Sequence, residues 1–449
     1  QNVGQLVEDY MATGTLEFVE PDYYAIAAGG QATIPNDQFF SSSWGLKNTG
    51  QSFVPGAIAG ADVQMTEAWD VETGDVNVVL STLDTGLKTD HPEFAGRLWV
   101  NAGEIPNNGL DDDNNGYVDD INGYNTIYDN EYVGDDVGHG TNVTGISAAT
   151  GNNSIGYAGA DWHCKVMTVK CLDSNNTGSF SAIIEALYYS VDNGADVVNM
   201  SLGGPSFSSA MNQAVIYASQ NEVTIVAAMG NANNSVTSYP AGYSSVIAVG
   251  ATNANDQRTA PFSWGGGSSY GSHISVCAPG NYIYGLSNTS NTNYNSYWSG
   301  TSQATPLVSG IATLLKAHDP SITPAEIKSL LELTADDQVG NPSEDTPGFD
   351  QYHGHGRVNA YAALNSIGIS EEELLRDLQI YPNPARDFLK LNWLQNRILK
   401  VELINTLGNV VYATELFSGI SIIDLSQFPA GLYFLQIDRS AVKKVLIAR

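Results

Sequence analysis

The sequence predicts an α/β domain with a parallel β-sheet and helices on both faces, followed by a small all-β sandwich. Between about residue 38 and residue 367, runs rich in β-branched residues alternate with segments of helical periodicity, which is typical of a parallel sheet. Beyond residue 378, short strand-like runs are separated only by Gly and Pro turns. A length of 449 residues also favours more than one domain.

Each predicted element follows from a local pattern. Continuous apolar runs predict buried parallel strands at 76–83, 164–172, 196–200, 223–228 and 245–249. Apolar residues at helical spacing predict helices at 180–192, 208–220, 302–317 and 324–333. Alternating apolar residues predict the sandwich strands at 388–393, 400–405, 410–416, 421–425, 432–438 and 443–447.

The composition excludes several classes of function. The chain carries 48 acidic and 18 basic residues, a net charge of -30 that repels nucleic acid and anionic membranes. It has no run of about 18 apolar residues, the length needed to span a membrane. Cys164 and Cys171 fall in one predicted strand, roughly 23 Å apart, beyond the roughly 7 Å limit for a disulfide. Cys277 is expected to be a buried apolar residue, so cysteine usage does not decide the compartment.

Three separate segments carry reactive residues in glycine-containing frames. Asp84 ends an apolar run and begins Asp-Thr-Gly, His139 lies between two glycines, and Ser302 lies in Gly-Thr-Ser-Gln-Ala-Thr-Pro at a predicted helix start. A serine becomes nucleophilic when a histidine accepts its proton, and an acid fixes the histidine tautomer. Asp-Thr-Gly is also the signature of aspartic proteases, but the second such motif that they need is absent.

An oxyanion formed at the serine also needs hydrogen-bond donors. The strand predicted at 223–228 leads into Gly230-Asn231, which we expect to direct the Asn231 carboxamide into the cleft. The backbone N–H of Ser302, at a helix N-terminus, is the second expected donor. The alternative for Asn231 is an ordinary asparagine turn.

These segments resemble the subtilisin-like serine proteases, or subtilases, and the resemblance covers residues 38–367. It implies a seven-stranded parallel sheet, and cleavage of peptide bonds in extended polypeptides through an acyl-enzyme. Gly356-Arg357-Val358-Asn359-Ala360 resembles the closing segment of that domain. The implied substrate-binding residues are Ser201, Leu202, Gly203, Ala228 and Gly230, with the substrate adding as a strand beside 201–203.

Three positions depart from the family pattern. Gln303 replaces the usual methionine after the nucleophile, and Asn142 replaces the second histidine of His-Gly-Thr-His. Without that thioether, we expect activity to resist mild peroxide. Met229 replaces an alanine expected beside the S1 wall, and we expect medium to large apolar P1 residues.

An acidic loop predicts a calcium site. Residues 111–116 have the Asp-x-Asp-x-Asn-Gly spacing of an EF-hand-like loop, although its twelfth position is Asn122 and not Glu. A solvated acidic loop is the alternative. The expected ligands are Asp111, Asp113, Asn115, Tyr117 and Asp120.

Resemblance to thermitase-like subtilases implies a second calcium site. The segment 152–157 looks like their calcium loop, residues 35–37 resemble the mature amino terminus, and an acid follows His-Pro at position 93. The implied ligands are Asp37, Glu93, Asn153, Ile155 and Tyr157.

The ends of the chain suggest a secreted zymogen. Residues 1–33 resemble the end of an inhibitory propeptide, which would act as inhibitor and chaperone, and we expect any signal peptide to lie upstream of Gln1. The predicted domains are the propeptide remnant at 1–33, the catalytic domain at 34–368, an acidic linker at 369–377 and a sandwich at 378–449. Tyr381-Pro382-Asn383-Pro384 and Lys443-Lys444-Val445 resemble the type IX secretion sorting domain of Bacteroidota.

The primary interpretation is a calcium-stabilised, secreted monomeric endopeptidase with polypeptide substrates and the type IX secretion machinery as partners. It would reach the cell surface or extracellular space through the periplasm. The alternative is a catalytically silent surface adhesin on the same scaffold, which the intact set of Asp84, His139, Asn231 and Ser302 disfavours.

Overall fold

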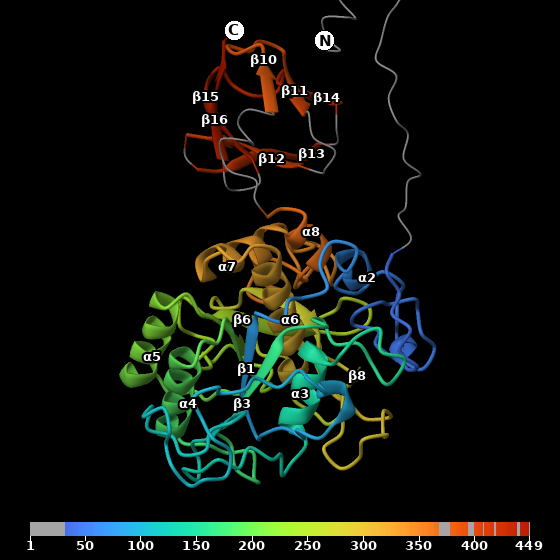
Figure 1. Ribbon diagram of the computed structural model, residues 1–449. Helices are drawn as coiled ribbons and strands as arrows, with labels where there is room; N and C mark the ends of the chain where they lie inside the picture. Colours follow the sequence, from blue (N-terminus) through green and yellow to red (C-terminus); the bar gives the residue numbers. More distant parts are fainter. Residues whose placement is uncertain are drawn as a thin grey trace, which may run out of the picture. The chain divides into compact units, whose positions relative to one another are not determined.

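A computed structural model describes residues 32–367, 378–393, 399–406, 408–416, 419–437 and 441–448. A parallel sheet in the order β2-β3-β1-β4-β5-β6-β7 forms the centre of residues 32–367 (Figure 1). Its strands are β1 (Val79–Asp84), β2 (Gly123–Asn125), β3 (Lys165–Lys170), β4 (Val197–Met200), β5 (Thr224–Ala228), β6 (Ile247–Thr252) and β7 (Val276–Pro279). All the pairings in this sheet are parallel, as the sequence predicts.

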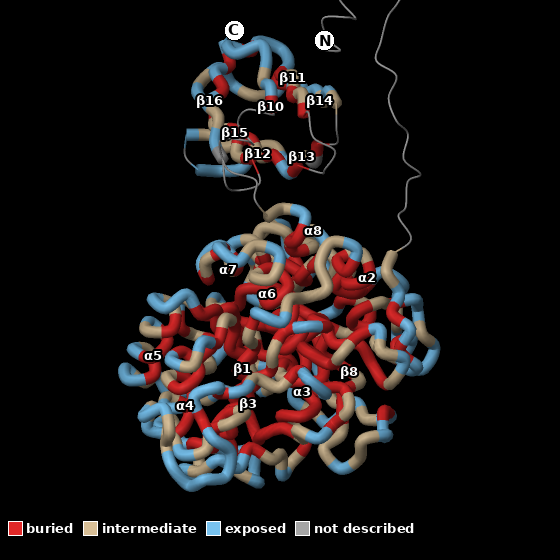
Figure 2. Tube along the Cα trace, in the orientation of Figure 1, coloured by how far each residue is buried: buried red, intermediate tan, exposed pale blue. Residues whose placement is uncertain are grey.

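Helices cover both faces of the sheet, and each face has its own apolar core. Helices α3 (His139–Ala148), α6 (Thr301–His318) and α7 (Pro324–Leu333) pack into one core, to which the sheet contributes Leu80, Val197 and Val226. Helices α4 (Phe180–Asp192) and α5 (Ser209–Gln220) pack into the other, to which it contributes Val198 and Ile225. Figure 2 shows the buried centre between these layers. Consecutive residues of a strand thus pack into opposite cores. Both faces of each strand are buried, which is why the strands are continuous apolar runs in the sequence.

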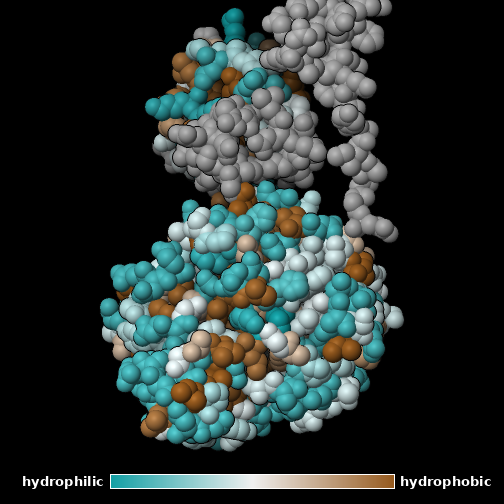
Figure 3. Space-filling model, viewed as in Figure 1, coloured by the Kyte–Doolittle hydropathy of each residue, from teal (hydrophilic) through white to brown (hydrophobic). Residues whose placement is uncertain are grey.

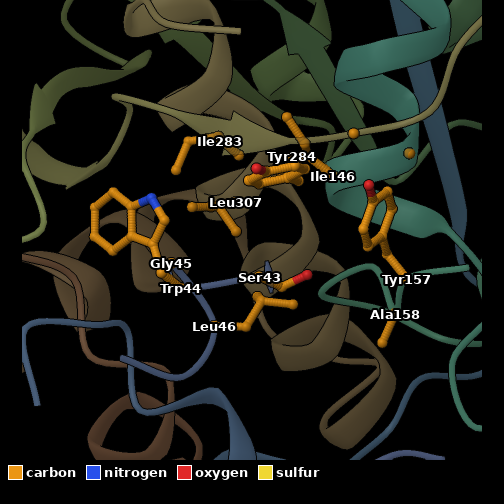
Figure 4. Close-up of a pocket in the computed structure, with 12 residues that line it drawn as sticks. Ser43, Trp44, Gly45, Leu46, Ile146, Tyr157, Ala158, Ile283, Tyr284 and Leu307 are labelled. Carbon is orange, nitrogen blue, oxygen red and sulfur yellow. The ribbon is translucent and has the colours of Figure 1, made fainter. Parts of the chain in front are cut away.

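The remaining elements of residues 32–367 are short. They are the 3₁₀-helices Phe40–Ser42 and Pro92–Phe94, the helices α2 (Met65–Ala68) and α8 (Ala360–Leu364), and the antiparallel strands β8 (Ile283–Tyr284) and β9 (Tyr297–Trp298). The segment before α2 packs over a small apolar pocket, where Trp44 and Leu46 lie near Tyr157, Tyr284 and Leu307 (Figure 4). This packing fixes the chain just after Asp37 against the body of the fold.

The C-terminal residues form two antiparallel sheets, which confirms the predicted all-β unit. One has the order β10-β11-β14 and the other β13-β12-β15-β16. The strands are β10 (Leu378–Tyr381), β11 (Phe388–Trp393), β12 (Leu399–Asn405), β13 (Val410–Leu416), β14 (Gly419–Asp424), β15 (Gly431–Ile437) and β16 (Ala441–Ile447). Alternate residues such as Leu389, Leu403 and Leu435 are fully buried between the sheets.

The predicted propeptide remnant lies outside the described residues except for Ala32 and Thr33, and the predicted linker at 369–377 lies outside them entirely. Within the described parts of the chain, no helix is long and apolar enough to cross a membrane. Figure 3 shows hydrophilic residues over much of the visible face of residues 32–367, interrupted by smaller apolar patches.

Candidate active site

The three reactive residues predicted from the sequence are brought to one edge of the sheet. Asp84 is the last residue of β1, His139 is the first residue of α3, and Ser302 is the second residue of α6. His139 and Ser302 line the same cavity, and His139 Nδ1 lies 2.8 Å from Asp84 Oδ1. The sheet and two helices thus position the groups, because the carboxyl ends of parallel strands share one edge.

Glycines allow the Asp84 and His139 segments to approach one another. A Cβ at Gly140 would lie 2.1 Å from the carbonyl oxygen of Gly86, so any side chain there would push α3 away from β1. Thr85 Oγ1 accepts a hydrogen bond from the Gly140 amide at 2.9 Å and donates one to Asp135 at 2.8 Å. The Asp-Thr-Gly and Gly-His-Gly frames therefore fit together through backbone contact.

Electrostatics favour a charged histidine beside a buried carboxylate. Asp84 is 1% exposed, and its Oδ1 accepts hydrogen bonds from the Thr85 amide and the imidazole. Burial is the largest single influence and lowers the pKa of His139, but the negative charge of Asp84, its hydrogen bond to the ring and the charge of Asp135 together outweigh it. The net result is a pKa raised above its ordinary value of 6.5. A base held in this way is stabilised as it accepts a proton.

Ser302 is held by a reciprocal contact with Ser201. Its hydroxyl donates to the Ser201 carbonyl at 3.0 Å, and the Ser201 hydroxyl donates to the Ser302 carbonyl at 2.9 Å. In this rotamer the nucleophile hydrogen-bonds to the substrate-binding segment. Rotation about one side-chain bond would be needed to direct it to the imidazole, as apo active sites often require.

Asn231 lies three residues past the end of β5 with a fixed amide orientation. Its Oδ1 accepts hydrogen bonds from the Thr301 amide at 2.8 Å and the Thr301 hydroxyl at 3.0 Å. Because both contacts use the oxygen, the Nδ2 group, which lies close to Gly300, remains as a donor, and Asn231 lines the same cavity as Ser302. Thr301 was missed by the sequence analysis, since nothing in the sequence links position 301 to position 231.

The cavity has a volume of about 510 Å³ and contains all the predicted substrate-binding residues. Ser201, Leu202 and Gly203 line it together with Ala228 and Gly230. The sequence analysis missed its other lining residues, which are Leu172, Asn176, Thr177, Gly178, Phe180, Ile183, Gly204, Ser238 and Thr301.

Backbone groups along one wall are available to a ligand. Leu202 and Gly203 make no backbone–backbone hydrogen bond within the described residues, although they directly follow β4. The wall can therefore pair with an extended chain. The expectation that Met229 borders the S1 wall is wrong. Met229 is 0% exposed and packs into the core formed with α4 and α5, because its side chain points to the opposite side of the backbone.

Two predicted calcium ligands come together as buried carboxylates. Glu93 is 0% exposed and accepts a hydrogen bond from Asn153 Nδ2 at 2.7 Å, and Asp37 is 6% exposed and accepts one from the Asn152 amide at 2.7 Å. Glu93 Oε1 and Asp37 Oδ1 are buried without a partner in the described part of the chain. Burial raises the pKa of Glu93 to about 7, to which the charge of Asp37 contributes. Unpartnered carboxylate oxygens near each other suit a hard divalent cation.

The other three residues of that predicted set, Asn153, Ile155 and Tyr157, lie on one loop. Asn153 Oδ1 accepts from the Ile155 amide at 2.9 Å, and Tyr157 is 3% exposed against Tyr294 and Tyr284. Ile155 and Tyr157 therefore offer only their backbone carbonyls.

The acidic loop places Asp111 and Asp113 close to Glu104, a residue that the sequence analysis missed. Oxygens of these three carboxylates lie within 4.8 Å of one another. Asn115 stays beside them through its amide contacts to Asp111 and Asp113, each at 3.0 Å.

Asp120 and Tyr117 have other contacts in the structure. Asp120 is fully buried and accepts hydrogen bonds from Tyr189 and Asn101 at 2.6 and 2.8 Å. The Tyr117 ring packs against Tyr124 and Tyr189, so of the predicted ligand only the backbone carbonyl remains to face a cation.

Comparisons with known proteins agree with this geometry. Residues 75–356 match the model of the subtilase family. Thermitase of Thermoactinomyces vulgaris is 35% identical over 335 residues, which are 74% of this chain and 99% of thermitase. The thermophilic serine proteinase of Bacillus sp. (strain AK1) is 33% identical over 81% of this chain and 76% of its own length.

Solved structures show the same fold. Proteases from Pseudoalteromonas arctica superpose with a TM-score of 0.57 at 28% identity, over 74% of this chain and 99% of theirs. Residues 379–448 match the secretion system C-terminal sorting domain, which directs type IX secretion to the cell surface or extracellular space. The chain thus belongs to the subtilase family of serine proteases and carries a C-terminal sorting domain.

Proposed function

We propose that this subtilase is a secreted serine endopeptidase that acts through an acyl-enzyme. The observation that carries the proposal is the 2.8 Å contact between His139 and Asp84, with Ser302 lining the same cavity. Asp84 would orient the imidazole, and His139 would take the proton of Ser302 and pass it to the leaving amine. The Ser302 amide and Asn231 Nδ2 would hold the oxyanion.

The proposed substrates are extended polypeptides. The unpaired backbone at 202–203 would add the substrate as a strand, which recognises main chain more than side chains. The cavity lining includes the small residues Ala228, Gly230 and Ser238 and contains no Asp, Glu, Lys or Arg. This favours a medium to large apolar P1 side chain.

The proposed zymogen has an inhibitory segment at 1–33, a catalytic domain at 34–368 and a linker at 369–377 before the sorting domain. Calcium would be held by Asp37, Glu93 and the 153–157 loop, and at the acidic loop by Glu104, Asp111 and Asp113. The calcium ions would have a structural role, because they would neutralise carboxylates that lie close together in the folded protein.

A quenched fluorescent peptide with an apolar P1 residue tests the function. Protein freed of residues 1–33 should cleave it, and Ser302→Ala should reduce turnover to background. If well-folded protein cleaves neither this peptide nor unfolded casein, the adhesin alternative replaces the proposal.

A further inference from the structure

The segment that follows α7 gathers two carboxylates and an imidazole away from the active-site cavity. Asp345, Asp350 and His353 each offer a ligand atom, and these atoms lie within 4.8 Å of one another. Asp345 is 3% exposed and His353 is 0% exposed, whereas Asp350 is partly exposed. The cluster is therefore buried but has one side open toward solvent.

The histidine ring has one nitrogen free to bind a ligand. His353 Nε2 lies 3.3 Å from the carbonyl oxygen of Asp256, which can only accept a hydrogen bond, so Nε2 carries the proton. Nδ1 then bears a lone pair, and it is buried without a hydrogen-bond partner within the described residues. A carbonyl that fixes the opposite nitrogen is the usual arrangement around a metal-binding histidine.

The two carboxylates have no cationic side chain as a recorded partner in the described part of the chain. Asp345 accepts hydrogen bonds from the amides of Gln338 and Gly340 at 3.2 and 2.5 Å. Asp350 accepts from the amides of Thr346, Tyr352 and His353 at 3.0, 2.7 and 2.9 Å. These amides orient the carboxylates. Both oxygens of Asp345 and Oδ2 of Asp350 keep a further lone pair, whereas Oδ1 of Asp350 already accepts from two amides.

Another buried carboxylate oxygen lies on the same segment, at Asp337. The pKa of Asp337 is raised by burial and further by the charge of Asp345, and its Oδ1 is buried without a partner among the described residues. Arg258, the cation bound to this segment, pairs instead with Glu344 at 2.8 Å. The ligand atoms of Asp345, Asp350 and His353 thus lie together, and no side-chain cation among the described residues is recorded as paired with the two carboxylates.

We propose that Asp345, Asp350 and His353 form a binding site for Zn²⁺ or a similar first-row divalent metal. Two carboxylate oxygens and an imidazole nitrogen suit such an ion, whereas Ca²⁺ prefers oxygen donors only. The site is separate from the proposed calcium loops and from Asp84, His139 and Ser302. The proposal does not depend on the proposed function.

The bound ion would stabilise the closing segment of the domain. Residues 336 and 357 pair with each other at 2.7 and 3.0 Å, and the Gly356 carbonyl and Val358 amide pair with Cys277 of β7. A metal joining Asp345 to Asp350 and His353 would cross-link the loop between these anchors. It would raise the melting temperature as any ligand of the native state does.

The test uses metal-depleted full-length protein that carries His139→Ala. This substitution prevents autolysis and removes a competing imidazole. Excess Ca²⁺ is present so that sites made only of oxygen ligands are already filled. Calorimetric titration with ZnCl₂ should show one tightly bound Zn²⁺ ion per protein. His353→Gln should abolish this binding, and the control His355→Gln, two residues away, should retain it. An unchanged stoichiometry in His353→Gln, or no zinc binding at all, overturns the proposal.

If His353→Gln fails to fold, Co²⁺ bound to the His139→Ala protein decides the matter. A visible spectrum of a low-coordinate ion with nitrogen and oxygen ligands is expected. A spectrum identical to that of aqueous Co²⁺ contradicts the site.

Discussion

Gln303 donates a hydrogen bond from Nε2 to Oδ1 of Asn142 at 3.2 Å, and both side chains are buried. These are two of the positions at which the chain departs from the family pattern. Gln303 stands where the family usually has a methionine, and Asn142 stands where it usually has a histidine. The two departures compensate each other, because each buried amide supplies a hydrogen-bond partner for the other. The pair joins α3, which carries His139, to α6, which carries Ser302.

The pair predicts resistance to oxidation. Met65, Met167, Met200, Met211 and Met229 are all 0% exposed, so no exposed thioether lies among the described residues. Activity should survive mild peroxide, while Gln303→Met should lose activity through sulfoxide formation beside the nucleophile. Residual activity after timed peroxide treatment measures this. Equal inactivation rates for the two proteins would contradict it.

The same substitution should destabilise the fold. Gln303→Met removes the donor to Asn142, whose Nδ2 already lacks a partner among the described residues. The expected loss is about 1–3 kcal/mol in the free energy of unfolding. Urea denaturation of inhibited protein measures it, and a variant as stable as the parent would show that the buried pair contributes little.

Asn231 should contribute to turnover as a hydrogen-bond donor. Asn231→Asp keeps an oxygen for Thr301 but loses the donor, so kcat should fall by about 10²–10³, the loss seen in a subtilisin without this donor. Asn221→Ala, at the exposed end of α5, serves as the control. Near-normal kcat in Asn231→Asp, with Ser302 still reactive, would remove Asn231 from the oxyanion site.

The pH dependence should report the contact between Asp84 and His139. His139 must be neutral to act as a base, and its pKa is raised above 6.5, so kcat/KM should fall as the pH drops through a midpoint above that value. Asp84→Asn removes the charge that raises the pKa, so the midpoint should move to lower pH while kcat falls about 10⁴-fold. An unshifted midpoint would assign the titration to another group.

Calcium should stabilise the protein most strongly at neutral pH. The pKa of Glu93 is raised to about 7 in the folded chain and returns to about 4.5 on unfolding. Without calcium, folding therefore becomes less favourable as the pH rises from about 4.5 to about 7, by about 3 kcal/mol at most. A cation on the ionised carboxylate offsets this loss.

Melting temperatures with calcium and with EDTA, taken across this pH range, measure the effect. The difference should widen as the pH rises and should shrink in Glu93→Gln. Asp113→Asn, in the separate acidic loop, serves as the matched comparison. A difference that is equal in Glu93→Gln and the parent would exclude Glu93 as a ligand.

The sequence predicted the strands and helices best where the spacing of apolar residues matches the period of the element, as in the alternating strand β11 and the amphipathic helix α4. It failed for β2, β7 and α3. The short strands β2 and β7 lie at the sheet edges, and α3 is rich in Gly, Thr and Ser, which have low helix propensity. Tertiary packing against β1 and α6 determines α3.

As with the fold, only part of the active site could be predicted from the sequence. Reactive residues in distinctive frames could be identified, whereas supporting contacts between distant segments could not. Thr301 to Asn231 and Gln303 to Asn142 are such contacts, and Glu104 joins the acidic loop from outside its motif. Spacing along the chain carries no information about these pairs.

Labelling with a fluorophosphonate tests the central claim most directly, because the probe reacts with an activated serine. Protein freed of residues 1–33 should be modified at Ser302 alone, as shown by mass spectrometry of the labelled peptide, and His139→Ala should abolish the modification. Folded protein that remains unlabelled, or that is labelled at another residue, would contradict the assignment of Ser302 as the nucleophile.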